Sequence, residues 1–246
     1  LVGERDRHSP ARMTTPRWYA RPDGAGIDLR RAPRLASWNK ITDPEQLLLR
    51  HYLDDTAELL SPSMVDSGPW ALVLDVGLPP GRDLLDRADL DNYAYPLATR
   101  MGDERLVSVW CTKRHADTSR VHVASANETV PPDGAHTVRT TASTQTTAYK
   151  EQIRSALAGA PPIPPGPVEL QVAFVVGPGR NWTNLWKPTI DALDPLLDRT
   201  RPDRDWHPLD GRITELALHV HVDLALQHDV VASIIAAPAR TETIGP

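Results

Sequence analysis

The chain has 246 residues, 40% of them hydrophobic and 24% charged, with a formal net charge of −5, as in an ordinary globular protein. A single cysteine, Cys111, rules out an internal disulfide, and the sequence contains no apolar run of about 18 residues that could span a bilayer. The first residues lack an apolar signal core, so we expect a cytoplasmic protein with no membrane partner, and the negative charge allows at most a local basic groove.

In chain order, the first expected element is a disordered or irregular leader over residues 1–30, which is rich in charge. Apolar residues at helical spacing predict a helix over 43–60 and another over 146–160. Each helix is followed by a linker that contains proline and then by a strand-like apolar stretch, at 68–82 and 166–180. The predicted elements therefore begin to repeat.

The two apolar stretches have matching ends. Residues 68–82 read GPWALVLDVGLPPGR and residues 166–180 read GPVELQVAFVVGPGR, so both begin with GP and close with PGR. Downstream, NYAYP at 92–96 corresponds to NLWKP at 184–188, and a helix is expected to follow in each copy with its proline near the start. A motif that recurs in this order indicates a tandem duplication.

Each copy continues with further strands. The expected pairs are 103–113 with 210–224, and 119–125 with 230–236. We therefore predict an α/β (mixed α+β) fold made of two helix-strand-helix-strand modules. The modules span 31–127 and 128–246, and they are expected to form a single-chain pseudo-dimer with an approximate two-fold axis.

An acidic cluster precedes the predicted helix of the first copy. Asp89 and Asp91 are separated by one residue and followed by Asn92, and further aspartates lie just upstream. Neighbouring carboxylates repel one another, and either exposure to water or a bound cation relieves the repulsion. The cluster is therefore either a solvated helix cap or a metal site.

The second copy, with AYKEQIRSAL, GPVELQVAF, the spaced motif N-L-x-K-P-x-x-D-A-L and DGRITEL, resembles the RusA family of Holliday-junction resolvases. The resemblance covers about 115 residues of the second copy and, more weakly, the core of the first. It implies a homodimeric, magnesium-dependent endonuclease of mixed α and β structure that acts on junction DNA. In that family D-L-D-N precedes the helix, a lysine follows the asparagine by three residues, and an acidic pair opens the next strand.

The two copies depart from this pattern in different places. The first copy keeps D-L-D-N at 89–92 and the acidic pair Asp103-Glu104, but Tyr95 stands where the family has its lysine. The second copy keeps the lysine as Lys187 and one acid of the pair as Asp210. Its two other carboxylates are replaced by Asn181 and Thr183, which are poor ligands for magnesium.

The resemblance implies a set of site residues centred on the first copy. Asp89, Asp91, Asp103 and Glu104 would bind Mg²⁺ (or Mn²⁺), and Asp89, Asp91 and Glu104 would be catalytic together with Lys187. Lys187 would supply the cation if the two copies pack as a dimer does, and Lys113 is the local alternative. The residues expected to contact DNA phosphates are Arg82, Arg87, Lys113, Arg180 and Lys187.

Three other groups of residues have two interpretations each. His219, His221 and Asp223 share one face of a predicted strand, either as metal ligands or, more commonly, as solvent-facing or hydrogen-bonded polar groups. Asp191 is either a functional acid or an ion-pair partner of Lys187 one helical turn away. The two tryptophans that flank the second motif either pack in the core or stack on an unpaired base; they are Trp182 and Trp186.

Three functions from different classes follow from this sequence. The first is a metal-dependent, structure-specific endonuclease that cuts branched DNA mainly through the first module. The second is a catalytically inactive protein that binds DNA junctions, and the third is a protein-interaction scaffold that retains only the fold. Further homodimerisation of the chain is compatible with all three.

Overall fold

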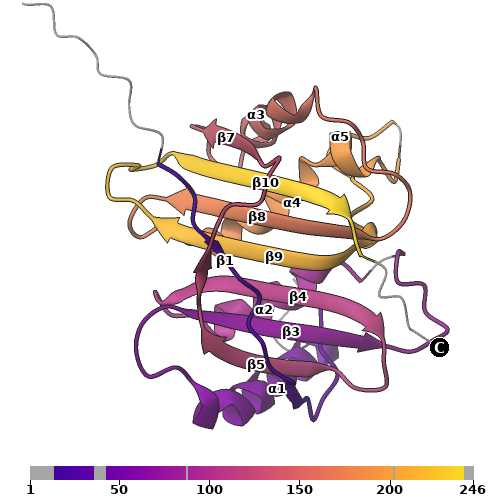
Figure 1. The fold of residues 1–246 in the computed structure, drawn as a ribbon. Helices are drawn as coiled ribbons and strands as arrows, with labels where there is room; N and C mark the ends of the chain where they lie inside the picture. Colours follow the sequence, from indigo (N-terminus) through magenta and orange to yellow (C-terminus); the bar gives the residue numbers. More distant parts are fainter. Residues whose placement is uncertain (1–13, 36–42, 87, 202, 241–246) are drawn as a thin grey trace, which may run out of the picture.

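The fold is a single mixed sheet with helices packed on one of its faces. The computed structural model describes residues 14–35, 43–86, 88–201 and 203–240. Eight strands form the main sheet in the order β2-β5-β3-β4-β9-β8-β10-β7. The helices lie behind this sheet in the view of Figure 1, while the N-terminal segment crosses in front of it. The predicted mixed α and β fold class is confirmed.

Both halves of the chain contain the same series of elements. The first half consists of α1 (Pro44–Leu60), β3 (Trp70–Leu78), α2 (Leu90–Met101), β4 (Leu106–His115) and β5 (Arg120–Ser125). The second half consists of β7 (His136–Thr140), α3 (Thr147–Leu157), β8 (Val168–Val176), α4 (Trp186–Asp191), α5 (Asp194–Leu197), β9 (Ile213–Val222) and β10 (Val230–Pro238). Three short 3-10 helices complete the set: η1 (Ser61–Ser63), η2 (Trp182–Leu185) and η3 (Asp210–Arg212).

The strand pairing also repeats. β3 runs parallel to β4 and antiparallel to β5, and β8 runs parallel to β9 and antiparallel to β10. In both parallel pairs the register shifts by one residue directly after the first position, between Trp70 and Ala71 and between Val168 and Glu169. The same irregularity at the same place is consistent with the duplication deduced from the sequence.

The two halves meet where β4 pairs antiparallel with β9. Since Trp70 and Val168 pair with Leu106 and Ile213, these two positions correspond in β4 and β9. Counting from them, Trp110 corresponds to Ala217, and these two residues are paired with each other. On one side of this pair Ser108 faces His219, and on the other side their counterparts Glu215 and Thr112 face each other. A local two-fold axis through the pair relates strands in this way.

The core lies between the sheet and its helices. Alternate residues of the central strands are fully buried beneath α2 in the first half and beneath α3 and α4 in the second. Both faces of the parallel strands are covered over much of their length, so β3 and β8 read as nearly continuous apolar runs.

The opposite face of the sheet is crossed by the N-terminal segment. Trp18 and Tyr19 form β1, which pairs with β6 (Glu128–Thr129), and Ile27 and Asp28 form β2 at the edge of the main sheet. We call residues 14–30 the strap. Trp18 is only 2% exposed, so this part of the expected disordered or irregular leader is held against the sheet, mostly as irregular chain; residues 1–13 lie outside the described residues.

Of the two prolines expected near helix starts, Pro188 lies in the first turn of α4 as expected, and Pro96 does not. α2 begins at Leu90, so Pro96 is inside the helix and not near its start. The second copy has a shorter helix at the position of α2.

Candidate active site between the two halves

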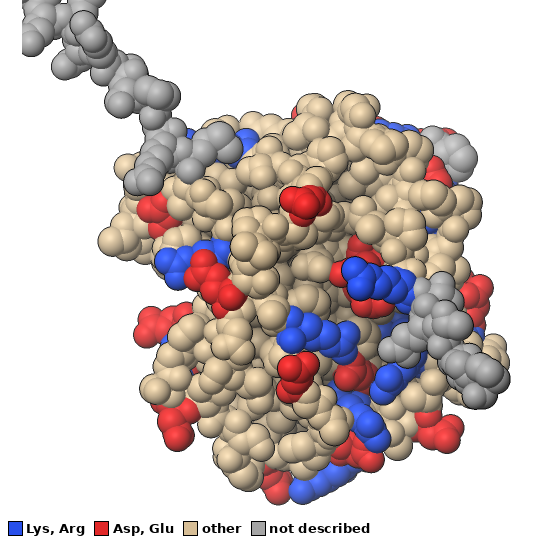
Figure 2. Space-filling view, viewed as in Figure 1, with Lys and Arg blue, Asp and Glu red and all other residues tan. Residues whose placement is uncertain are grey.

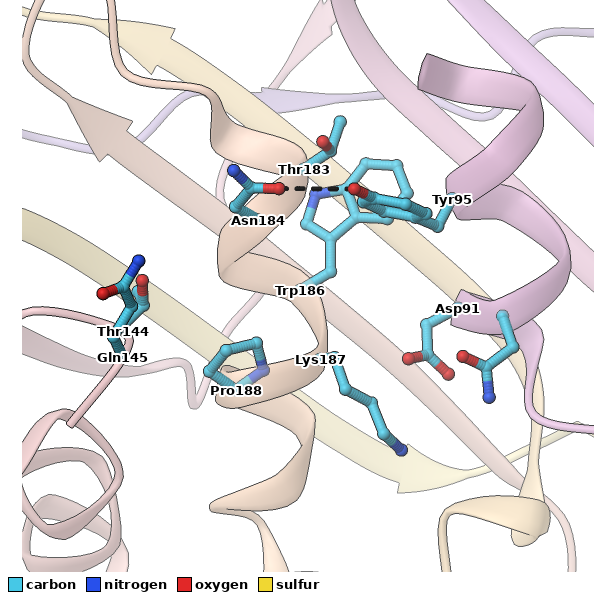
Figure 3. A pocket seen from close by; sticks show the side chains of 10 residues that line it. Asp91, Tyr95, Thr144, Gln145, Thr183, Asn184, Trp186, Lys187 and Pro188 are labelled. Carbon is cyan, nitrogen blue, oxygen red and sulfur yellow. Dashed lines mark hydrogen bonds between the residues drawn. The ribbon is translucent and has the colours of Figure 1, made fainter. Parts of the chain in front are cut away.

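A groove lies between α2 of the first half and the segment η2 to α4 of the second (Figure 3). Its cavity volume is about 490 Å³. Side chains from both halves line it: Asp91, Asn92, Tyr95, Thr144, Gln145, Thr183, Asn184, Trp186, Lys187 and Pro188. In Figure 3, Asp91 and Tyr95 project from one helix toward Lys187 and Asn184 on the other side.

At one end of the groove, three aspartates surround a lysine. We call this part of the site the acidic end, and it consists of Asp89, Asp91, Asp210 and Lys187. Asp89 is the N-cap residue of α2 and Asp91 lies in its first turn, whereas Asp210 opens η3 just before β9. The C-terminal ends of β3 and β4 and the N-terminal end of β9 lie at the same edge of the sheet, because β4 and β9 are antiparallel. The halves therefore contribute different acids to one place.

Lys187 connects the acids of the two halves. Its Nζ lies 2.7 Å from a carboxylate oxygen of Asp210 and 3.3 Å from one of Asp191. Burial by itself would lower the pKa of Lys187, but Asp91, Asp210 and Asp191 outweigh it and raise that pKa well above the usual range. Lys187 is therefore fully charged, and its expected ion pair with Asp191 is confirmed.

Asp91 is the most perturbed acid of the acidic end. Its side chain is 4% exposed, and burial raises its pKa to about 6, with Asp210 adding to the effect and Lys187 opposing it. Burial and the charge of Asp210 also raise the pKa of Asp89. Carboxyl groups that titrate close to neutral pH are typical of sites that exchange protons or bind cations.

Lys113 fixes the two acid-bearing segments to each other. Its buried Nζ donates hydrogen bonds to the backbone carbonyls of Ala88, at 3.1 Å, and Gly211, at 2.7 Å. These carbonyls lie directly beside Asp89 and Asp210 in the chain. Burial lowers the pKa of Lys113 to about 8, although both aspartates oppose the shift. Lys113 is thus a structural cation beneath the acidic end, and its burial argues against the expected DNA contact.

The other end of the groove holds the corresponding residues of the opposite copy, and we call it the neutral end: Asn181, Thr183, Asn184 and Tyr95. Asn181 accepts hydrogen bonds from the backbone N–H and the hydroxyl of Thr183, at 3.1 and 2.8 Å. The hydroxyl of Tyr95 lies 3.4 Å from the side-chain oxygen of Asn184, in the place that corresponds to Lys187 (Figure 3). This end carries amides and hydroxyls in place of carboxylates and a lysine.

Asp103 and Glu104 do not join Asp89 and Asp91, which corrects the expected ligand set. They follow the C-terminal end of α2, a helix of 12 residues and therefore about 18 Å long, whereas the other two acids are at its N-terminal end. Asp103 instead accepts hydrogen bonds from the indole of Trp70 and from Arg105, which lower its pKa against the effect of burial. Asp210 occupies the expected place of Glu104.

The expected DNA-contacting arginines follow corresponding strands of the two halves and do not themselves line the groove; Arg82 lines a second cavity together with His115. Arg82 follows β3 and is exposed, and it acts electrostatically on Lys113 at the acidic end. Arg180 follows β8 and directly precedes Asn181 at the neutral end. Arg87 lies outside the described residues.

The sheet face carries mixed charge. Figure 2 shows lysine and arginine next to aspartate and glutamate there, not one broad basic surface. Ion pairs of the strap contribute to this pattern, such as Arg21 with Asp75 at 2.6 Å and Arg120 with Asp28 at 2.7 Å.

The tryptophans of the second motif belong mainly to the core. Trp186 is buried and packs edge-on against Trp182, with ring centroids 5.0 Å apart, and against Tyr95 at 6.4 Å. Trp186 thereby forms the floor of the groove between its two ends.

The histidine pattern of β9 is not a metal site. His219 is fully buried, where its Nδ1 lies 3.0 Å from the hydroxyl of Ser108 and its ring packs against Trp18, Tyr19 and Trp110. The expected division of β9 into a buried and a solvent-facing side fails here because the strap covers the second face. Desolvation in this aromatic cluster lowers the pKa of His219 to about 3.

Within the described residues, no group of three or more His, Cys, Asp or Glu side chains is gathered closely enough to hold a metal ion. The donor chemistry of the acidic end nevertheless suits a hard divalent cation, because its three aspartates offer charged oxygens and repel one another. Lys187 provides the opposing charge in this structure. In the described part of the chain, no helix is both long and apolar enough to cross a membrane.

Comparison with known proteins identifies no relative. No family model, no curated protein and no solved structure matches this chain with statistical significance.

Proposed function

We propose that this protein is a metal-dependent endonuclease that acts on branched DNA through one composite site at the acidic end of the groove. The observation that carries the proposal is the meeting of Asp89 and Asp91 from the first half with Lys187 and Asp210 from the second. The choice of branched DNA as the substrate rests on the resemblance to the RusA family.

The acidic end has the groups that phosphodiester hydrolysis needs. Asp89, Asp91 and Asp210 would hold Mg²⁺ or Mn²⁺, which would neutralise the phosphate and lower the pKa of a bound water. Lys187 would contact a non-bridging phosphate oxygen, whose negative charge grows as the water oxygen bonds to phosphorus. A carboxylate oxygen of the acidic end that does not coordinate the ion would accept the proton of that water. One ester P–O bond then breaks, and the departing sugar oxygen takes a proton from solvent.

Lys113 would act in this reaction as a positioning residue. Its hydrogen bonds to Ala88 and Gly211 hold the segment before α2 against the segment before β9. Because Asp89 and Asp210 lie on these segments, loss of Lys113 should separate the acids contributed by the two halves.

The test is cleavage of a labelled four-way DNA junction in the presence of Mg²⁺ or Mn²⁺, analysed on denaturing gels. Asp91→Asn, Asp210→Asn and Lys187→Met should each lower the rate by about 100-fold or more. Glu104→Gln, an exposed acid at the other end of α2, is the matched control and should keep the wild-type rate. Equal loss in Glu104→Gln would contradict the composite site.

A non-catalytic junction-binding protein is the second candidate. It is favoured by the ion pair of Lys187 with Asp210, and by the fact that the three aspartates of the acidic end are not gathered to ligating distance in the described structure. Salt-dependent junction binding without cleavage at any metal concentration would support this candidate over the nuclease.

A further inference from the structure

The two ends of the groove differ in how they can interact with a phosphate. At the acidic end, carboxylates repel a phosphate unless a cation lies between them. At the neutral end, the hydroxyls of Thr183 and Tyr95 donate hydrogen bonds to the side-chain oxygens of Asn181 and Asn184. These bonds orient the two amides, whose NH2 groups can donate to phosphate oxygens without a cation. The acidic end therefore needs a metal ion to bind a phosphate and the neutral end does not, although residues of both ends line one cavity.

The corresponding positions follow from the repeat. The aligned motifs match Asp89 with Asn181, Asp91 with Thr183, and Lys187 with Tyr95. Every residue that the acidic end uses from these motifs is thus replaced by a neutral one at the other end. Asp103 corresponds to Asp210, but its carboxylate is occupied by Trp70 and Arg105.

Both ends are nevertheless equipped to meet a DNA strand. An arginine follows the strand that leads into each end, Arg82 after β3 and Arg180 after β8. The local two-fold relation at Trp110 and Ala217 places these arginines on opposite sides of the joint between the halves. The molecule therefore presents two similar surfaces to two strands, of which only one surface has the groups for chemistry.

We propose that this chain holds two strands of a branched DNA but cuts only the strand at the acidic end, while the neutral end binds the other strand without metal. This inference rests on the proposed function and specifies its product, a single nick. The substitutions at the neutral end are then the reason that it binds without cutting, because amides and hydroxyls neither hold the cation nor repel the phosphate.

The first experiment follows each strand of a four-way junction separately, with the junction in excess so that one chain binds per junction. We expect cleavage in Mn²⁺ on denaturing gels without resolved duplexes on native gels. Paired symmetric cuts by single chains would overturn the inference and leave the proposed nuclease function intact. The absence of any cleavage would overturn both.

The second experiment restores the acidic residues at the neutral end. Asn181→Asp with Thr183→Asp should weaken junction binding in EDTA by about 10-fold or more and should add a second Mn²⁺ site, counted by calorimetry without DNA. Adding Tyr95→Lys should convert nicking into paired cuts. The matched control, Asn127→Asp with Thr129→Asp, adds the same two charges at exposed positions beside the strap, on the side opposite the groove, and should keep one Mn²⁺ site, single nicks and the affinity in EDTA.

Failure of the restored variant to fold is checked by its melting curve, and the single variant Thr183→Asp then takes its place. Thr183→Asp should still weaken binding in EDTA, because the new charge lies in the groove. Unchanged affinity in EDTA for a folded Thr183→Asp variant would show that the neutral end does not contact DNA and would overturn the inference.

Discussion

At the scale of single residues, Asp91 is buried and has four charged neighbours that shift its pKa: Lys187, Asp210, Asp89 and Asp191. It lies in the first turn of α2, where the helix dipole favours an anion, and Lys187 also favours its charged form. Burial and the other aspartates outweigh these effects and raise its pKa to about 6. Ionised Asp91 therefore destabilises the folded protein when no metal ion is bound.

This imbalance predicts how stability depends on pH. The unfolded chain ionises Asp91 near its ordinary pKa, whereas the folded chain does so only near 6, so the destabilisation is absent below about pH 4, grows between the two values and is complete above 6. Asp91→Asn should therefore stabilise the metal-free protein at pH 7.5 by on the order of 1–3 kcal/mol and have little effect at pH 4. Urea unfolding in EDTA measures both.

The control for this prediction is Asp133→Asn, a change in an exposed turn of the linker between the halves. Its effect should be small and independent of pH. A stabilisation by Asp91→Asn that stays the same from pH 4 to 7.5 would show that the ionisation of Asp91 is not its cause.

At the scale of elements, the strap is bound to the sheet more firmly than its short strands suggest. β1 has only two residues, but Trp18 is buried against His219 and Tyr19 packs on the same ring. Arg21 reaches Asp75 on β3, so the strap contacts strands of both halves. It thereby covers the joint between β4 and β9 from the side opposite the groove.

Trp18→Ala should consequently destabilise the whole molecule by about 3–5 kcal/mol, as is usual when a large buried aromatic side chain is removed. Water would also reach His219, whose low pKa depends on burial, so its imidazole should begin to titrate closer to pH 6.5. Thermal melts and NMR titration of the imidazole test the two effects. Arg17→Ala, next in the chain but half exposed, should change neither by much.

At the scale of the whole molecule, the pairing of β4 with β9 makes one sheet from two similar halves. The register places Trp110 opposite Ala217 at the centre of this joint. A large residue faces a small one there, whereas two copies of the first half would bring tryptophan against tryptophan. The joint therefore favours association between unlike halves.

This asymmetry predicts the behaviour of a divided chain. Polypeptides spanning 14–127 and 128–240, produced together, should form a 1:1 complex that binds junction DNA, because the strand pairing and the groove need both halves. Each half alone should aggregate or remain partly unfolded, since its edge strand and half of the groove are exposed. Light scattering and circular dichroism measure this, and two separately folded monomers would contradict it.

The sequence by itself determined the repeating elements of this protein. The apolar spacing predicted α1, α3, β3 and β8, and the matching GP and PGR turns predicted that the halves have the same topology, because these signals are local. It did not predict β1, β2, β6 or β7, since short strands acquire their pairing from distant partners. Asp89, Asp91 and Lys187 were identified as candidates from their motifs, whereas Asp210 was identified only as a retained position of a copy with degenerate motifs.

Only the tertiary structure decided which of these residues share a site. The resemblance to the RusA family grouped Asp89 and Asp91 with the acidic pair Asp103-Glu104 of the same copy. The helix α2 separates them, however, and the antiparallel pairing of β4 with β9 brings Asp210 to the acidic end instead. Likewise, the alternation along β9 indicated a solvent-facing His219, which the strap covers. Proximity between segments distant in sequence is set by strand direction and packing, and neither is encoded in local spacing.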